Sequence, residues 1–210
     1  MEDFLIQKYL SFKKQNFPNY KDIFESLGNK QKPHTLFITC SDSRVIAELI
    51  TNSLPGELFV VKNIANIVPP YENSDISSSV AGAIEYAVLV LNVQNIVVCG
   101  HSNCGGCNAL YLEEEKLKDK PNVKKWISIS KEIPEKVKQL INEKDLEKRS
   151  EITEKLNVVK QLENLLTYPF VKEKVENGEV KIYGWYFVIK TGDLYNYNFK
   201  TGEFEIVKEE

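Results

Sequence analysis

Short runs of consecutive apolar residues alternate along the chain with segments of helical periodicity. The runs are residues 34–40, 57–63 and 95–100, and they are rich in β-branched and aromatic side chains. Such runs are typical of strands that are buried on both faces of a parallel sheet. The spacing of apolar residues predicts helices over 2–15, 20–27, 44–51, 76–91 and most of 105–166.

The alternation of strands and helices predicts an α/β fold with a mostly parallel central sheet flanked by helices. Residues 180–199 are predicted to form an antiparallel hairpin that turns at Thr191-Gly192-Asp193. We expect a single domain over residues 1–210, because the length suits one core and no linker or repeat is visible. Residues 1–28 are expected to form a helical arm that contacts a second copy of the chain. Packing on its own sheet is the alternative for the arm's apolar stripe of Phe4, Leu5, Tyr9 and Phe12.

The composition of the chain argues against a nucleic-acid-binding protein, a membrane protein and a disulfide-rich protein. Lysine and arginine number 27 against 30 aspartates and glutamates, and the net charge of −3 argues against a nucleic-acid partner. The N-terminus lacks the features of a signal peptide, and polar residues interrupt the longest apolar region, residues 80–100, so we expect no membrane span. Four cysteines are too few for a disulfide scaffold, which predicts reduced thiols and a cytoplasmic location.

Metal-ligating residues follow two of the predicted strands. Cys40 ends the first strand, and His101 and Cys104 follow the third. In open α/β sheets, sites form beyond the carboxyl ends of strands. Cysteine sulfur and histidine nitrogen are zinc ligands, and three of them leave the fourth position that a catalytic zinc requires. The pattern therefore predicts one zinc ion per chain.

Two other interpretations of these residues remain open. Each of them could be an ordinary buried residue, or "CGGC" (104–107) could be a redox pair. A redox pair would not explain His101 or the nearby Asp42 and Arg44. We interpret Cys99 and Cys107 as structural thiols, and His34 as a surface or core residue at the wrong end of its strand.

Four segments carry a resemblance to a known family. "CSDSRV" (40–45), "PGELFVVKNIANIVPP" (55–70), "AIEYAV" (83–88) and "VVCGHSNCGG" (97–106) resemble the β-class carbonic anhydrases, closely over residues 28–110 and loosely elsewhere. The resemblance implies zinc-dependent, reversible hydration of CO2 to bicarbonate and a proton. It also implies an antiparallel strand at one edge of the sheet. The family assembles as homodimers or multiples of dimers, with active sites at the dimer interface.

The catalytic chemistry assigns roles to Asp42 and Arg44. Zinc lowers the pKa of bound water to about 7 in histidine-ligated hydratases, and the hydroxide attacks CO2. Two thiolate ligands offset the metal's charge, so we expect a higher water pKa and activity that favours alkaline pH. Arg44 is expected to hold Asp42 in a two-pronged pair, so that its carboxylate orients the hydroxide instead of ligating zinc. The alternative is a loop salt bridge; the resemblance implies the orienting role.

The resemblance also implies a substrate pocket that uses Gln31, Phe59 and Tyr86, and we add Gly106 to the expected substrate-binding residues. Phe59 and Tyr86 would form walls of this pocket, in the same chain or from the neighbouring chain; ordinary core packing is the alternative. Gly106, with Gly105, would allow close backbone approach and offer amides to a ligand sulfur. Lys62 stands where the family usually has arginine and loses the bidentate geometry of that residue.

Some family members have a closed form in which the aspartate ligates zinc and a nearby bicarbonate stabilises it. The positions that match this bicarbonate pocket are Phe37, Lys62 and Phe187. Phenylalanine offers no hydrogen-bond donor there. We therefore expect Asp42 to remain paired with Arg44 at neutral pH.

Three rival functions stay open. They are hydrolysis of carbonyl sulfide or carbon disulfide on the same fold, a non-catalytic zinc-binding module, and a thiol redox protein that uses Cys104 and Cys107.

Overall fold

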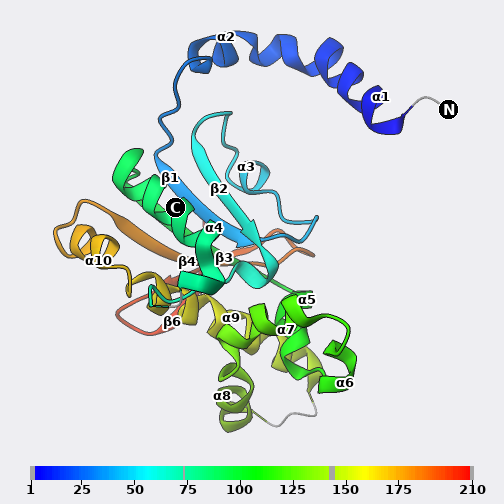
Figure 1. Cartoon of the computed structure of the whole chain (residues 1–210), viewed down its shortest axis with the longest axis vertical. Helices are drawn as coiled ribbons and strands as arrows, with labels where there is room; N and C mark the ends of the chain where they lie inside the picture. Colours follow the sequence, from blue (N-terminus) through cyan, green and yellow to red (C-terminus); the bar gives the residue numbers. More distant parts are fainter. Residues whose placement is uncertain (1–2, 73, 142–144, 209–210) are drawn as a thin grey trace.

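A six-stranded sheet forms the centre of the computed structural model (Figure 1). The structure describes residues 3–72, 74–141 and 145–208, with only the backbone of residues 74–78. In spatial order the strands are β2 (Leu58–Asn63), β1 (Thr35–Cys40), β3 (Asn95–His101), β4 (Lys181–Phe187), β5 (Leu194–Asn198) and β6 (Glu203–Ile206). The first four run parallel, and β5 and β6 are added antiparallel at one edge. This arrangement confirms the predicted fold class.

The C-terminal edge contains one strand more than predicted. The expected hairpin is present as β4 and β5, and β6 then returns along β5 after a turn at Gly202, where φ is +74°. Glycine adopts this left-handed conformation without the steric cost that other residues meet. The alternating "EFEI" after Thr201-Gly202 is a sequence signal for this second hairpin.

Three helices precede β1, and the others lie in the connections between strands. They are α1 (Phe4–Ser11), the π-helical η1 (Phe12–Asn16), α2 (Phe17–Leu27), α3 (Ala47–Ile50), η2 (Ile64–Asn66), α4 (Ser74–Glu85), the π-helical η3 (Tyr86–Val90), α5 (Gly105–Asn108), η4 (Ala109–Tyr111), α6 (Glu114–Leu117), α7 (Pro121–Ile127), η5 (Ser128–Ser130), α8 (Ile133–Leu140), α9 (Leu146–Leu165) and α10 (Pro169–Glu176). The helix predicted over 44–51 is wrong in length, because only α3 forms there and the preceding residues belong to a loop. Among the described helices, none combines the length and the apolar character needed to cross a membrane.

The two faces of the sheet are covered unequally. Leu36 and Ile38 of β1 point to a core that includes side chains of α4, α9 and α10. Phe37, between them, points to the opposite face. There it packs with Ala47 of α3, while the surrounding aromatic residues of β4 are only half-buried.

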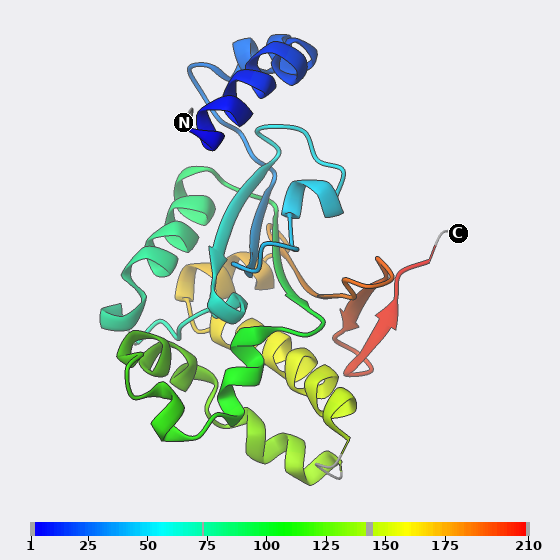
Figure 2. The same ribbon diagram turned by 90° about the vertical axis from the view of Figure 1, so that its right-hand side faces the viewer.

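The N-terminal arm extends away from the sheet (Figures 1 and 2). The Asp3 side chain caps α1 by accepting a 2.9 Å hydrogen bond from the Leu5 amide. Phe4, Leu5 and Tyr9 are 69%, 73% and 58% exposed, so the stripe does not pack on the chain's own sheet. An apolar surface of this kind is typical of an interface with another chain.

A polar stripe of α9 fixes the segment that follows β2. Asn157 donates to the Ala65 carbonyl at 2.9 Å, and Gln161 accepts from the Val68 amide at 2.9 Å. Both side chains are fully buried. These bonds hold a segment in which Ala65 has a φ of 61°, a conformation that costs energy for a residue with a Cβ atom.

Candidate metal centre

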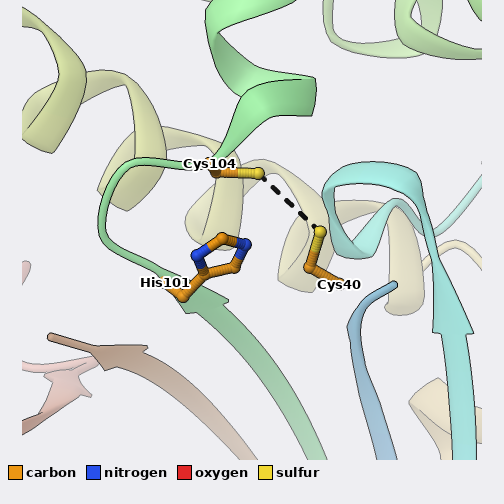
Figure 3. A group of neighbouring side chains, drawn as sticks. All are labelled: Cys40, His101 and Cys104. Atoms are coloured by element: carbon orange, nitrogen blue, oxygen red, sulfur yellow. Dashed lines mark hydrogen bonds between the residues drawn. The ribbon is translucent and has the colours of Figure 1, made fainter. Parts of the chain in front are cut away.

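The ends of two adjacent parallel strands bring the three predicted ligands together. Cys40 is the last residue of β1 and His101 is the last residue of β3. The chain then turns back through Asn103, where φ is 56°, and Cys104 forms the N-cap of α5. Figure 3 shows the three side chains converging from these positions.

The donor atoms have the spacing of a tetrahedral metal site. The ligand atoms of Cys40, His101 and Cys104 all lie within 4.8 Å of one another, and the two sulfur atoms are 3.9 Å apart. Two sulfur ligands of a tetrahedral zinc ion lie about 3.8 Å apart, given Zn–S bonds of about 2.3 Å. The geometry therefore fits zinc without rearrangement of the strands.

The histidine ring is oriented for ligation. His101 is fully buried, and its Nδ1 lies 3.0 Å from the Ser102 carbonyl, to which it donates. This bond leaves the lone pair on Nε2, which is buried and has no hydrogen-bond partner among the described residues. Metal-ligating histidines are commonly oriented in this way, so the orphaned Nε2 supports a metal position.

The two cysteines are neutral thiols when no metal is bound. Contact with the Cys104 thiol and burial raise the pKa of Cys40 to about 12. Contact with the Cys107 thiol and burial likewise raise the pKa of Cys104 to about 12. A metal ion that binds here displaces these protons, because thiolates are the ligands.

Asp42 and Arg44 form the expected two-pronged pair beside the cluster. Arg44 Nε donates to Asp42 Oδ1 at 2.9 Å, and Arg44 Nη2 donates to Asp42 Oδ2 at 2.7 Å. These bonds hold the pKa of Asp42 well below its usual range. Asp42 Oδ2 lies 3.9 Å from His101 Nε2, so the carboxylate faces the cluster while remaining paired with Arg44.

Lys62 stabilises the loop that carries this pair. Its Nζ donates to the carbonyls of Asp42, at 3.2 Å, and Val45, at 2.6 Å. The lysine that replaces the family's usual arginine thus acts as a donor to backbone carbonyls, which does not require a planar bidentate group.

Two of the three positions matched to the bicarbonate pocket, Phe37 and Phe187, are packed aromatic rings, and the third, Lys62, donates to the two backbone carbonyls described above. Phe37 is fully buried and meets the ring of Trp185 at 5.8 Å between centroids. Phe187 packs against the same group of residues. Neither phenylalanine ring offers a hydrogen-bond donor to a bicarbonate, which is the reason for expecting Asp42 to stay paired with Arg44.

A cavity of about 620 Å³ lies near the carboxyl end of β2. It is lined by Ser41, which follows the ligand Cys40, and by residues of β2 and α7 that include Val61 and Trp126. The Trp126 indole donates to the Ile64 carbonyl at 2.8 Å, which fixes this wall. Neither the three predicted ligands nor the Asp42–Arg44 pair lines this cavity.

Gln31, Phe59 and Tyr86, the other predicted pocket residues, do not lie at the cluster. Phe59 is paired in register with Leu36, four residues before Cys40, which places it about 13 Å from the cluster along the strand. The Phe59 and Tyr86 rings lie 6.0 Å apart, and Gln31 and Tyr86 line a separate cavity of about 620 Å³. The structure therefore gathers these three residues at the opposite end of the sheet and not around their own chain's cluster.

Gly106 is in close contact with the segment after β2. A Cβ atom at this position would lie 2.8 Å from both Ala65 Cβ and Ile64 Cγ2, whereas one at Gly105 would meet nothing within 4 Å. The close approach expected at Gly106 is thus a packing contact that sets α5 against η2.

The two glycines give a matched test of this contact. Gly106→Ala is expected to lower the free energy of unfolding by about 1–3 kcal/mol, because the methyl group would overpack the contact. Gly105→Ala is expected to change it by less than about 0.5 kcal/mol, since this position is exposed. Urea denaturation of both variants measures the difference, and equal stabilities would show that the contact is unimportant.

The redox alternative is not favoured by the surroundings of Cys107. This thiol is 2% exposed, and Cys99 is fully buried with its pKa raised to about 12 by burial. Reactive cysteines are partly exposed and have a lowered pKa. Both residues fit the structural role predicted for them.

Glu154 and Tyr186 adjoin the cluster and were not predicted. Glu154 of α9 accepts a 2.8 Å hydrogen bond from the Cys104 amide and one of 2.9 Å from the Tyr186 hydroxyl. Burial raises the pKa of Glu154 to about 7.

Comparisons with known proteins agree with the geometry. A family model described as carbonic anhydrase matches residues 35–194. A carbonic anhydrase of Helicobacter pylori (strain J99) is 45% identical over 205 residues, which cover 95% of this chain and 92% of the relative. The solved structure of the β-carbonic anhydrase CcaA has a TM-score of 0.90 at 34% identity, covering 98% of this chain and 91% of that one. Tetrameric β-carbonic anhydrases from Sordaria macrospora match with a TM-score of 0.79 at 28% identity, over 92% and 94%.

Proposed function

Because this chain belongs to the β-class carbonic anhydrases, we propose that it hydrates CO2 reversibly to bicarbonate and a proton at a zinc ion held by Cys40, His101 and Cys104. The observation that carries the proposal is the convergence of three ligand atoms within 4.8 Å, with the Asp42–Arg44 pair beside them. One zinc ion per chain follows from the single cluster of this kind found among the described residues.

Zinc, when bound, supplies a Lewis acid that lowers the pKa of water enough to produce a nucleophile near neutral pH. The chain's own contribution begins with Asp42, whose carboxylate is held ionised by Arg44 and faces the cluster. An ionised carboxylate accepts the hydrogen bond of the attacking water and orients it toward the carbon of CO2. Arg44 also keeps Asp42 from moving onto the metal, because its guanidinium occupies both carboxylate oxygens.

The remaining pocket residues serve the active site of a second copy. Gln31, Phe59 and Tyr86 lie at the far end of the sheet from their own cluster, so within one chain they cannot contact the same small substrate. A symmetric dimer can place them at the partner's cluster, since the same surface acts on both subunits. The exposed apolar arm offers further contact area for this dimer. The tetrameric relatives from Sordaria macrospora are consistent with assembly from dimers.

Subunit complementation tests this arrangement. Gln31→Ala and Cys40→Ser are each expected to inactivate the homodimer. Mixing and reassociating equal amounts should restore about a quarter of the wild-type activity, because half of the random dimers are heterodimers with one intact site each. Measured CO2 hydration that stays at the level of the separate variants would show that Gln31 serves its own chain.

The substrate is tested by parallel assays on one preparation. Stopped-flow CO2 hydration is expected to be fast, and sulfide release from carbonyl sulfide or carbon disulfide is expected to be slow. Faster release of sulfide than hydration of CO2 would assign the chain to the hydrolases. A metal-loaded protein that turns over none of the three would be a non-catalytic zinc module.

We also propose a cytoplasmic location. All four cysteines are free, and the two facing thiols of the cluster require a reducing compartment to remain available to a metal.

A further inference from the structure

A buried carboxylate lies directly behind one of the proposed metal ligands. Glu154 is 2% exposed in the middle of α9. Its Oε1 accepts from the Cys104 amide at 2.8 Å and from the Ser150 hydroxyl at 3.4 Å, and its Oε2 accepts from the Tyr186 hydroxyl at 2.9 Å.

Burial of the Glu154 side chain costs free energy, because its carboxylate loses hydrogen bonds to water. A carboxylate removed from water needs hydrogen-bond partners, and the donors that contact Glu154, which include the Asn103 amide besides the three above, are neutral. The neighbouring Lys155 forms its ion pair with Glu151, toward the surface, rather than with Glu154. Glu154 is therefore placed to accept a hydrogen bond from the Cys104 amide and not to form an ion pair with Lys155.

Main-chain groups of the loop after β3 bond to several neighbours, and the Asn103 amide shares Glu154 as a partner with the Cys104 amide. The Ser102 amide donates to the Phe187 carbonyl at 2.9 Å, and the Asn103 carbonyl accepts from Arg44 at 3.2 Å. The Cys104 amide is bonded to Glu154 alone in the described part of the chain. Glu154 therefore sets the direction of the Cys104 main chain, and with it the position of Sγ opposite Cys40.

We propose that Glu154 is a positioning residue for the metal site, oriented by Tyr186, which fixes Cys104 for ligation. This inference rests on the metal site proposed above. Glu154 acts through the Cys104 amide and does not reach the substrate. Partners of metal ligands typically contribute 10–100-fold to metal affinity.

Cobalt binding tests the proposal independently of turnover. Co²⁺ is titrated into metal-free protein, and its ligand-field and thiolate charge-transfer absorption reports coordination geometry. Glu154→Ala is expected to weaken Co²⁺ affinity about 10–100-fold and to alter the spectrum. Glu154→Asp should behave similarly, because its shorter side chain does not reach the amide. Glu154→Gln should restore both affinity and spectrum, since its amide oxygen can accept the same bond.

Glu151→Gln is the matched control, because Glu151 lies one turn away on α9 and pairs with Lys155. It should leave affinity and spectrum unchanged. A wild-type spectrum and affinity in a folded Glu154→Ala or Glu154→Asp variant would overturn the proposal. Equal losses in Glu154→Gln and Glu154→Ala would also overturn it, by assigning the effect to charge. Failure of the wild type to bind Co²⁺ would overturn the metal site itself and this inference with it.

Discussion

Replacement of His101 with alanine is expected to abolish metal binding and CO2 hydration together. The orphaned Nε2 of His101 supplies the only nitrogen ligand in the cluster of described residues, and two thiols alone hold zinc poorly. The affinity for zinc should fall by more than about 100-fold, because even residues that merely support a ligand cost 10–100-fold. Zinc content after dialysis and stopped-flow hydration measure the two losses on the same sample.

His34→Ala and Cys107→Ser are the matched controls. His34 precedes β1, at the end opposite Cys40, and is exposed. Cys107 is buried next to the cluster but is not one of its three members. Both variants should retain zinc and activity. Loss of zinc from Cys107→Ser, with full retention in a Cys104→Ser variant, would mean that the wrong cysteine has been assigned.

Replacement of Asp42 with alanine is expected to lower kcat by about 100-fold or more while zinc remains bound. The three ligand atoms do not depend on Asp42, but the group that orients the attacking water is lost. Arg44→Ala should reduce turnover as well, because the released carboxylate, 3.9 Å from His101 Nε2, is then free to move onto the metal. Zinc analysis and stopped-flow kinetics separate the two effects.

Asp119→Ala provides the control for removal of an aspartate, since Asp119 is exposed in the turn after α6 and is not a member of the cluster. It should leave kcat unchanged. Wild-type turnover in both Asp42→Ala and Arg44→Ala would reduce the pair to a salt bridge of the loop.

The proposed ligand set could be predicted because its signals are local. Cys40 and His101 each end a continuous apolar run, and the carboxyl ends of neighbouring parallel strands meet at one edge of the sheet. The three-residue step from His101 to Cys104 then needs only one turn of chain. The same reasoning gave the β4–β5 hairpin but not β6, whose short alternating pattern contains only two apolar residues.

The buried polar face of α9 could not be predicted from its residues. Glu154, Asn157, Gln161 and Asn164 follow one another at steps of three or four residues. On a helix this spacing normally indicates a solvated face. Here the stripe is buried because it bonds the backbone of the segment after β2 and the Cys104 amide, which are distant in sequence. A single sequence contains no signal for these pairings.

The role of Gln31, Phe59 and Tyr86 could not be predicted from one chain alone. Their resemblance to family residues indicated a substrate pocket but not which subunit they serve. The strand register, with Phe59 opposite Leu36, the contact of Tyr86 with Phe59, and the cavity shared by Gln31 and Tyr86 place them away from their own cluster. Because these residues lie at the opposite end of the parallel sheet from their own cluster, we propose that they act on the cluster of the partner subunit.

Reconstitution of metal-free protein with zinc tests the central claim most directly. Zinc is added in steps below stoichiometry, and CO2 hydration is measured by stopped flow at each step. The account predicts an inactive metal-free protein whose activity rises in proportion to bound zinc and reaches a plateau at one ion per chain. Hydration by the metal-free protein, or no hydration when Cys40, His101 and Cys104 are fully occupied, would contradict it.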